Sequence, residues 1–287
     1  MKLLVSLGSK NIEDYLNYTN SFILGIKDFS VNYLEFSIDE IKELLEKYKN
    51  IELFVALNKN IFNPELDNLE KTLLELDKLN LKGILFYDLA VLSIHERLNL
   101  KTPLVFHQTH MVTNYNTCNL YYDKGCEYSV TSNEITSLEI SEIKDKTKQK
   151  LMTMFLGMPI VSHSRRSLLS NYLEYKNLKK EKENYVIKSG DSPEYIIREN
   201  GNKETSIIYK NIINGSEPMM ELKGKIEYGI LNEFLMDHEL FMKLLPLFSK
   251  LNKDVDVEKN RKLIKELIGE DTGFFYKKTI YKVKRGA

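Results

Sequence analysis

The chain of 287 residues contains no tryptophan, only two cysteines and six prolines, and no excess of either charge. Forty-one basic residues balance forty-one acidic ones, so no global field draws the protein to nucleic acid or to membranes, although a local patch could. Cys118 and Cys126 are too few for a disulfide scaffold or for a four-cysteine metal site. We therefore expect two free thiols, and neither DNA nor a membrane as a partner.

Long hydrophobic runs are also missing. None approaches the roughly twenty apolar residues that a membrane-spanning helix needs. The first apolar run meets Gly8, Ser9 and Lys10 before it reaches the roughly seven to fifteen residues of a secretion signal. We expect a cytoplasmic protein. What the chain does have is 43% hydrophobic residues, enough to bury a large core in one or two domains.

Short β-rich runs alternate with helix-length segments along most of the chain, which is typical of a parallel sheet with crossover helices. The runs are Lys2–Leu7, Phe22–Ile26, Ile51–Leu57, Gly83–Tyr87, Leu104–His107, Glu127–Val130, Lys150–Leu156 and Gly229–Leu235. Amphipathic helices are clearest at Ile38–Lys49 and Glu65–Leu79. Eight such units predict an α/β fold, a (β/α)8 TIM-like barrel, with weak patterns at Tyr33–Phe36 and in the fifth strand leaving the count open by one.

The segment 159–225 does not fit the βα repeat. It contains a Lys/Glu-rich run followed by short β-like pieces, at Lys176–Lys182, Tyr185–Lys188, Tyr195–Arg198 and Ser206–Tyr209. We predict that it is an insertion between strands 7 and 8, forming a subdomain, and that residues 1–158 and 226–287 form the barrel domain. The tail Phe274–Lys284 alternates aromatic and basic residues and is interpreted as a closing strand.

Polar side chains gather directly after several predicted strands, at the carboxyl ends where barrel enzymes hold their sites. They are Asn58, Asn60, Asp88, His107, Gln108, His110, Thr131, Ser132, Asn133, Glu134, His163, Arg165, Arg166, Asp237 and His238. Loops are polar in any barrel, with or without activity. The pattern nevertheless favours a functional site at this end.

Two pairs in this group have a chemical and a structural interpretation. His107 and His110 could offer imidazoles to a metal, but a histidine that closes a buried strand is more often a hydrogen-bonded core residue, and we expect no metal. Arg165 and Arg166 could clamp a carboxylate or phosphate through bidentate hydrogen bonds, or form a solvated surface pair. The sequence alone leaves the arginine alternatives open.

The amides and the ring of Asn114, Tyr115 and Asn116 could hydrogen-bond to a nucleobase and stack on it, or form a helix cap and a packed first turn. Cys118 follows in the same segment, but no base lies near it in sequence. We therefore do not assign it as a nucleophile.

Three segments resemble the bacterial collagenase-like peptidase family, peptidase family U32, over nearly the whole chain. They are TNYNTCN at Thr113–Asn119, GMPIVSHSRRSLLSNYLEY at Gly157–Tyr175 and GFFYKKTIYKVK at Gly273–Lys284. The resemblance is strongest to the shorter members from low-GC Gram-positive bacteria. It implies a barrel core and a role in oxygen-independent or prephenate-dependent hydroxylation, as in 5-hydroxyuridine formation at the tRNA wobble position, rRNA cytidine hydroxylation and anaerobic quinone synthesis.

The same resemblance implies an iron–sulfur cluster on four cysteines in many members, and pairs of paralogous subunits in some. This chain departs from the family pattern where those ligands stand. The family's His-Gly-x-x-Cys is replaced by LGMPI at Leu156–Ile160, and the next family cysteine falls at Ser167. We therefore expect no cofactor bound by this chain, because a four-cysteine cluster needs four thiolates.

The leading hypothesis is prephenate-dependent hydroxylation of the tRNA wobble uridine, with this chain as the cluster-free subunit beside a cysteine-bearing paralogue. tRNA and the co-substrate prephenate are the implied ligands. The candidate contacts are Arg165 and Arg166 for an anionic group, and His163, Asn114, Tyr115, Asn116 and His107 for the substrate. The alternatives are a collagenase-like peptidase, with His107/His110 or His163/Ser164 as its only candidate groups, and a non-catalytic scaffold for a catalytic paralogue. Whether the chain is itself an enzyme stays open.

Overall fold

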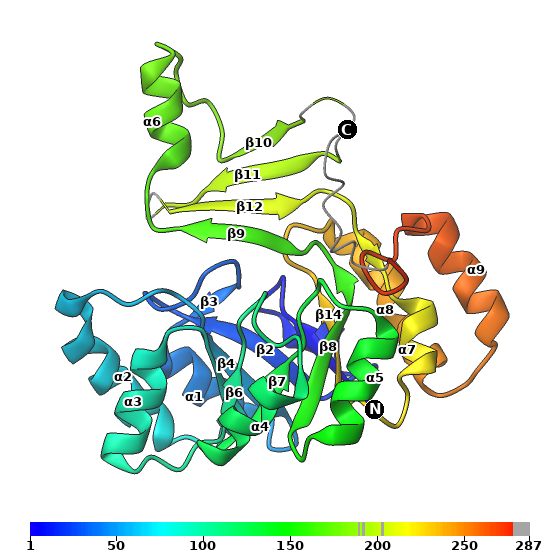
Figure 1. Cartoon of the computed structure of the whole chain (residues 1–287), viewed down its shortest axis with the longest axis horizontal. Coiled ribbons are helices and arrows are strands. Elements are labelled where there is room, and N and C mark those ends of the chain that lie inside the picture. The colour runs from blue at the N-terminus through cyan, green and yellow to red at the C-terminus, as the bar shows by residue number, and fades with distance from the viewer. Residues whose placement is uncertain (189, 191–192, 202–203, 278–287) are drawn as a thin grey trace, which may run out of the picture.

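The barrel is closed, because the first strand of the chain pairs with a neighbouring strand on each side. The computed structural model describes residues 1–188, 190, 193–201 and 204–277 (Figure 1). Eight parallel strands follow one another around a ring, and the last of them, β2, pairs again with β1. In ring order they are β1 (Lys2–Ser6), β14 (Tyr228–Asn232), β8 (Lys150–Gly157), β7 (Cys126–Val130), β6 (Leu104–Phe106), β5 (Gly83–Phe86), β4 (Glu52–Leu57) and β2 (Ser21–Ile26). The predicted (β/α)8 barrel is confirmed.

Helices cover the outside of this ring (Figure 1). They are α1 (Ile38–Lys47), α2 (Leu66–Asp77), α3 (Leu89–Leu98), α4 (Tyr115–Asp123), α5 (Ser137–Lys146), α7 (Ser216–Glu221), α8 (His238–Asn252) and α9 (Val257–Ile268), with 3₁₀ turns η1 (Ile12–Asp14) and η2 (Asn63–Glu65). The first helix begins at a capping box, in which the Ser37 side chain accepts from Glu40 N and the Glu40 carboxylate accepts from Ser37 N. No helix in the described ranges is long and apolar enough to cross a membrane.

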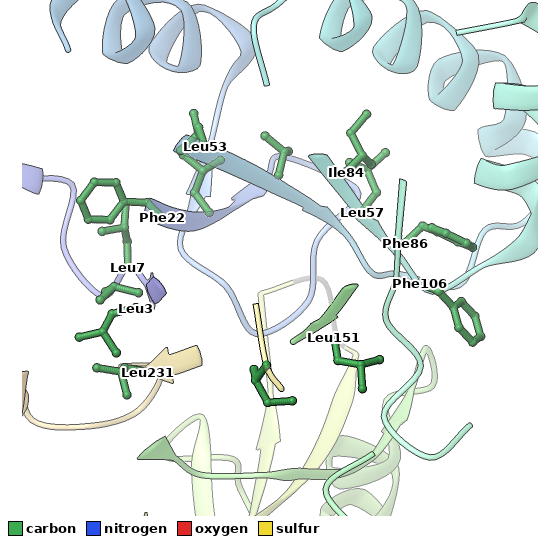
Figure 2. Close-up of a cluster of buried hydrophobic side chains, with 14 of the residues drawn as sticks. Leu3, Leu7, Phe22, Leu53, Leu57, Ile84, Phe86, Phe106, Leu151 and Leu231 are labelled. Carbon is green, nitrogen blue, oxygen red and sulfur yellow. The ribbon is translucent and has the colours of Figure 1, made fainter. Parts of the chain in front are cut away.

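Barrel strands are apolar on both faces because one face meets the helices and the other fills the lumen. In β4, Leu53, Val55 and Leu57 belong to the outer core, whereas Phe54 and Ala56 point into the barrel. Figure 2 shows part of the outer set, which is distributed around the ring, from Leu3 and Leu231 on one side to Phe106 on another. This double burial explains why the strands appear in the sequence as nearly continuous apolar runs.

The lumen is packed with aromatic rings and is not a pore. The Phe54 ring lies 5.1 Å from the Tyr228 ring and 5.9 Å from the Tyr128 ring, in edge-to-face arrangements. Tyr228 also donates to Glu52, whose carboxylate accepts from Ser21. These contacts plug the barrel beneath its carboxyl end.

A second, antiparallel sheet is inserted between β8 and β14. Its order is β10 (Asn184–Ile187), β11 (Tyr195–Glu199), β12 (Thr205–Tyr209) and β9 (Ile160–Ser164), and α6 (Leu168–Tyr175) joins β9 to β10. Figure 1 shows this sheet standing over the end of the barrel that β8 leaves. The predicted β-like pieces are strands β10, β11 and β12.

Of the polar residues expected to follow this barrel strand in a loop, Arg165 and Arg166 lie in a bend, but His163 lies within strand β9. This strand pairs antiparallel with β12, with Ser206 opposite His163. The partner strand lies far along the chain, so no local pattern could reveal the pairing.

Three short segments complete the backbone. The weak pattern at Tyr33–Phe36 contains β3 (Glu35–Phe36), which pairs with β2 outside the closed ring, and β13 (Ile213–Asn214) pairs antiparallel with β8. The predicted closing strand is wrong in its described part, since residues 273–276 form a turn in which the buried Phe275 ring stacks 5.8 Å from Phe155. The rest of that predicted strand lies outside the described residues.

Gly215 lies where the chain returns from the second sheet to the barrel. A Cβ at this position would lie 2.4 Å from the carbonyl oxygen of Phe155 and 2.6 Å from its Cα, and backbone atoms of a barrel strand cannot move aside cheaply. We expect Gly215→Ala to lower the free energy of unfolding by about 2 kcal/mol, measured by urea denaturation. Gly201→Ala is the control, because no described atom lies within 4 Å of its Cβ position. Equal stability of the two variants would contradict this packing.

Candidate functional site at the barrel mouth

A cavity of about 190 Å³ lies at the carboxyl ends of the barrel strands, beneath β9. It reaches the lumen core at Val130, Met154 and Ile230. Its polar lining consists of Asn32, Tyr33, Asn58, Tyr87, His107, Thr109, His110, Thr131, Asn133, Asn232, Ser162 and His163. Among the described lining residues there is no Asp, Glu, Lys or Arg, so the cavity is polar but carries no fixed charge. We call it the mouth cavity.

A second cavity of about 300 Å³ adjoins the first. The two share His110, Asn133, Met154, Ile160 and Val161. The second is bounded by the underside of the second sheet and the turn at residues 273–276, and rings from Tyr195, Tyr209 and Phe275 make it more apolar. The two cavities form one recess, divided by the start of β9.

His107 follows β6 and enters the mouth cavity from the barrel side. Its backbone N–H donates to the Phe86 carbonyl at 3.0 Å, which fixes the residue at the strand end. Its Nδ1 atom is shielded from solvent and has no hydrogen-bond partner among the described residues. Burial lowers the pKa of the imidazole from 6.5 to about 4, so the ring is neutral at pH 7.

His163 enters the same cavity from β9 on the opposite side. Its Nδ1 lies 3.0 Å from the Ser206 hydroxyl, which accepts a hydrogen bond from Asn32 Nδ2 at 2.9 Å. Ser206 keeps its own hydrogen and a second lone pair, so it can either donate to His163 Nδ1 or accept from it, and both tautomers of the ring satisfy this contact. His163 Nε2 is buried without a partner among the described atoms. Burial lowers the pKa of this ring as well, against the opposing pull of Glu204.

His110 links the two layers. Its ring contacts the Val161 carbonyl of β9 through Nε2 at 3.0 Å and the exposed Glu134 carboxylate through Nδ1 at 3.1 Å. The β6–α4 loop and the second sheet are therefore joined at the boundary between the two cavities.

Four charged side chains fasten the second sheet to the barrel beside the cavity. Lys59 and Glu65 come from the β4–α2 connection, and Arg165 and Glu204 flank the paired ends of β9 and β12 at the edge of the second sheet. Arg165 donates to both oxygens of Glu65, and its Nε donates to Glu204 at 3.2 Å. Lys59 Nζ lies 3.3 Å from Glu204, and the exposed fractions of these two side chains are only 7% and 3%. We call these four residues the ion-pair cluster.

The hydrogen bonds in the cluster set its charge states. Burial alone would raise the pKa of Glu65, but the hydrogen bonds from Arg165 and from Phe62 N outweigh it and leave the pKa below its usual value. Arg165 also donates to the Asn60 carbonyl at 2.9 Å and packs over the Phe62 ring. Most of its guanidinium donors are therefore engaged by its own chain, and an external anion would have to compete with Glu65.

The other predicted contact residues lie apart from the cavity. Arg166 is exposed and lines neither cavity. Asn114 caps α4 by accepting from Thr117 N at 2.9 Å, which is the structural alternative for this segment, and Tyr115 and Asn116 are exposed beside it. The fold thus brings together His107 and His163 from the predicted set, and not the asparagines.

Several residues of the site carried no sequence signal. Asn32 sits in a left-handed conformation, at φ 59°, in the loop after β2, and an Asn in a loop is too common to single out. Ser206 lies in β12, within a segment predicted only as a short β-like piece, and Glu204 lies just before that strand. Lys59 stands between two asparagines that were noted as polar loop residues. Each of these residues belongs to the site because it contacts a residue from another segment of the chain.

The donor set does not fit a four-cysteine cluster. Cys118 on α4 and Cys126 on β7 are free and fully buried, and burial raises the pKa of both thiols to about 12. Ile160, which stands where the resemblance places a cysteine, lines both cavities with an apolar side chain. Within the described ranges no group of three or more His, Cys, Asp or Glu side chains is placed to hold a metal ion.

Comparison with known proteins gives a family match. The model of peptidase family U32 matches residues 15–185. tRNA hydroxylation protein P2 of Bacillus subtilis (strain 168) is 26% identical over 293 aligned residues, covering 91% of this chain and 92% of that protein. tRNA hydroxylation protein P1 of the same strain is 26% identical over 140 residues, covering 48% of this chain and 33% of that protein.

Solved structures are similar at a lower level. A U32 peptidase has a TM-score of 0.46 and 12% identity, covering 55% of this chain and 70% of its own. Orotidine 5'-monophosphate decarboxylase from Methanocaldococcus jannaschii has a TM-score of 0.44 and 14% identity, covering 94% of this chain and 99% of its own.

Removal of Arg165 tests the ion-pair cluster. In Arg165→Met, Glu204 keeps only Lys59 as a nearby cation while remaining buried, and we expect the free energy of unfolding to fall by about 3 kcal/mol. Arg97→Met is the matched control, because Arg97 pairs with Glu70 at the surface and is 57% exposed; its loss should cost about 1 kcal/mol or less. Urea denaturation measures both, and equal losses would show that the cluster is no more than a surface pair.

Proposed function

The chain belongs to peptidase family U32, and from this membership we propose that it serves the hydroxylation of the wobble uridine of tRNA. The observation that carries the proposal is the similarity to tRNA hydroxylation protein P2, which extends over nearly the full length of both chains. The resemblance noted from the sequence supports the same function. The mouth cavity supplies a candidate place for the reaction, since barrel chemistry occurs at the carboxyl ends of the strands.

The peptidase alternative finds no support in the site. His163 Nδ1 bonds Ser206, and the hydroxyl of its neighbour Ser164 accepts from Arg166 N at 3.2 Å. Neither cysteine lies in a position to attack a substrate, because both thiols are buried and their pKa is raised. A nucleophile needs an adjacent base and an oxyanion site. Among the described residues of the two cavities we find no such set.

We propose further that the chain is the cluster-free partner of a cysteine-bearing paralogue in the cytoplasm. The relatives P1 and P2 occur in one strain, and the chain matches 92% of the length of P2 but only 33% of that of P1. The burial of both cysteines and the apolar side chain of Ile160 support the absence of a cluster in this chain. If this partner contributes no catalytic group, the same proposal makes the chain a non-catalytic scaffold for the paralogue.

Prephenate as co-substrate is part of the proposal and requires a cationic contact. A dianion placed in the uncharged mouth cavity would lose its hydration without gaining a counter-charge. Arg165 is engaged by Glu65 and Glu204, so Arg166, which is exposed next to the start of α6, is the better candidate of the two for an anionic group. The anionic site would then lie outside the mouth cavity.

Deletion of the gene tests the function directly. In a host without a redundant paralogue, we expect 5-hydroxyuridine and its derivatives in tRNA to fall several-fold, measured by nucleoside mass spectrometry. A plasmid copy should restore them, and so should a copy carrying Cys118→Ala and Cys126→Ala, because neither thiol has a role in the proposal. Unchanged nucleoside levels after deletion would contradict the proposed function.

The absence of a cluster has its own test. After anaerobic reconstitution with ferrous iron and sulfide, we expect the purified chain to hold no more iron and sulfide than the double variant Cys118→Ala, Cys126→Ala, as measured by chemical analysis. Iron and sulfide bound in stoichiometric amounts by the wild-type chain and lost in the double variant would refute this part of the proposal.

A further inference from the structure

We propose that the mouth cavity binds the uracil base itself, as an uncharged ring that leaves the RNA and inserts beneath β9 between His107 and His163. This inference rests on the proposed function, which names the substrate but not the place where it binds. The cavity, its lining and its two unpartnered imidazole nitrogens carry the argument.

The mouth cavity is the smaller part of the recess. At about 190 Å³ it is smaller than the roughly 300–1,000 Å³ of pockets that enclose drug-sized ligands. A single small ring fits this part of the recess better than a whole nucleotide. The lining offers flat or flexible faces for such a ring, from Tyr33 and Tyr87 and from Met154 and Met158. Enzymes that act on a base extrude it into a closely fitting pocket of this kind.

The charge of the lining selects an uncharged ligand. The charged side chains next to the cavity pair with one another in the ion-pair cluster, and the described lining contains no Asp, Glu, Lys or Arg. Both histidines lining opposite sides are held neutral by burial. Uracil is neutral at pH 7, whereas a phosphate or a dicarboxylate would need a counter-charge to be buried here.

The two histidines supply polar rings from the barrel side and from β9. His107 Nδ1 and His163 Nε2 have no hydrogen-bond partner among the described atoms, and the carboxylate nearest to His163 Nε2, that of Glu204, lies 3.9 Å away. Both nitrogens are shielded from solvent, so each ring has to turn before a base in the cavity can bond to it. Buried polar atoms without partners are rare in native proteins. Uracil offers an N–H donor flanked by two carbonyl acceptors, which can pair with an imidazole nitrogen in either tautomer.

The free-energy cost of moving the target base into the cavity is small because of its position in the tRNA. A wobble base lies in an unpaired loop, so no base pair has to open before it leaves its stack. The roof strand β9 is accessible from outside, as Val161 and Ser162 are both exposed while they line the cavity. The ring would therefore approach past β9, and the ribose and phosphates would stay outside.

Histidine NMR tests the inference on the full chain, because the sequence has only five histidines. The ring signals of ring-labelled protein are followed during titration with uridine, with adenosine as the control nucleoside. We expect saturable shifts of the His107 and His163 signals with uridine and none at His95 and His238, which line neither cavity. Adenosine, with its larger purine, should leave all four unchanged.

A variant pair tests the His163 contact. His163→Phe keeps a ring but removes both nitrogens, and should weaken uridine binding about tenfold, as expected for the loss of one buried hydrogen bond. His163→Gln keeps an N–H donor and should restore part of the affinity. Unchanged thermal unfolding shows that a variant still folds.

The outcomes separate this inference from the proposed function. If gene deletion lowers 5-hydroxyuridine but uridine shifts neither His107 nor His163, or adenosine shifts them equally, the base does not bind here and the inference is overturned while the function stands. If uridine binds as described but deletion leaves the nucleoside unchanged, the cavity is a pyrimidine site and the proposed function fails.

Discussion

Four charged side chains on two separate segments form ion pairs with one another and hold the second sheet on the barrel. Lys59 and Glu65 extend from the β4–α2 connection, and Arg165 and Glu204 from the edge of the second sheet, and Glu204 is almost fully buried. Separation of the second sheet from the barrel would expose these ion pairs to solvent. Removal of one of the four side chains would leave a charge without its counter-charge. This contact, together with the hydrogen bonds of His110 to β9 and of Asn32 to Ser206, holds the roof of the mouth cavity and His163 in place.

The barrel could be predicted from the sequence, and much of the site could not. Each barrel strand is buried on both faces, so its apolar run is a local signal that survives without knowledge of its neighbours. Strand β9 has no such signal, because none of its residues is fully buried and its partner β12 lies far along the chain. Asn32 bonds to Ser206, and Ser206 to His163, only in the folded chain, so the sequence alone did not identify Asn32 and Ser206 as site residues.

Arg165 makes the type of contact that the sequence suggested, but with a different partner. The sequence suggested a bidentate clamp for an anion, and the guanidinium does hold a carboxylate in this way, but the carboxylate is Glu65 of the same chain. Consequently the cation strengthens the frame of the site and leaves the cavity uncharged. Ile160 has a similar effect, since it places a methyl-bearing side chain where the family resemblance would place a thiolate. Together these residues leave the mouth cavity lined by uncharged side chains, which is the basis of the proposal that a neutral ring binds there.

The central claim is that a tRNA wobble base reaches the barrel mouth of this chain. Photocrosslinking with an anticodon stem-loop that carries 4-thiouridine at the wobble position tests it most directly, with the crosslinked peptide identified by mass spectrometry. The account predicts crosslinks in the segments that line the mouth cavity, at 107–110 on the barrel side or 160–163 on β9. Crosslinks confined to the outer helices, or none above those of an unmodified stem-loop, would contradict it.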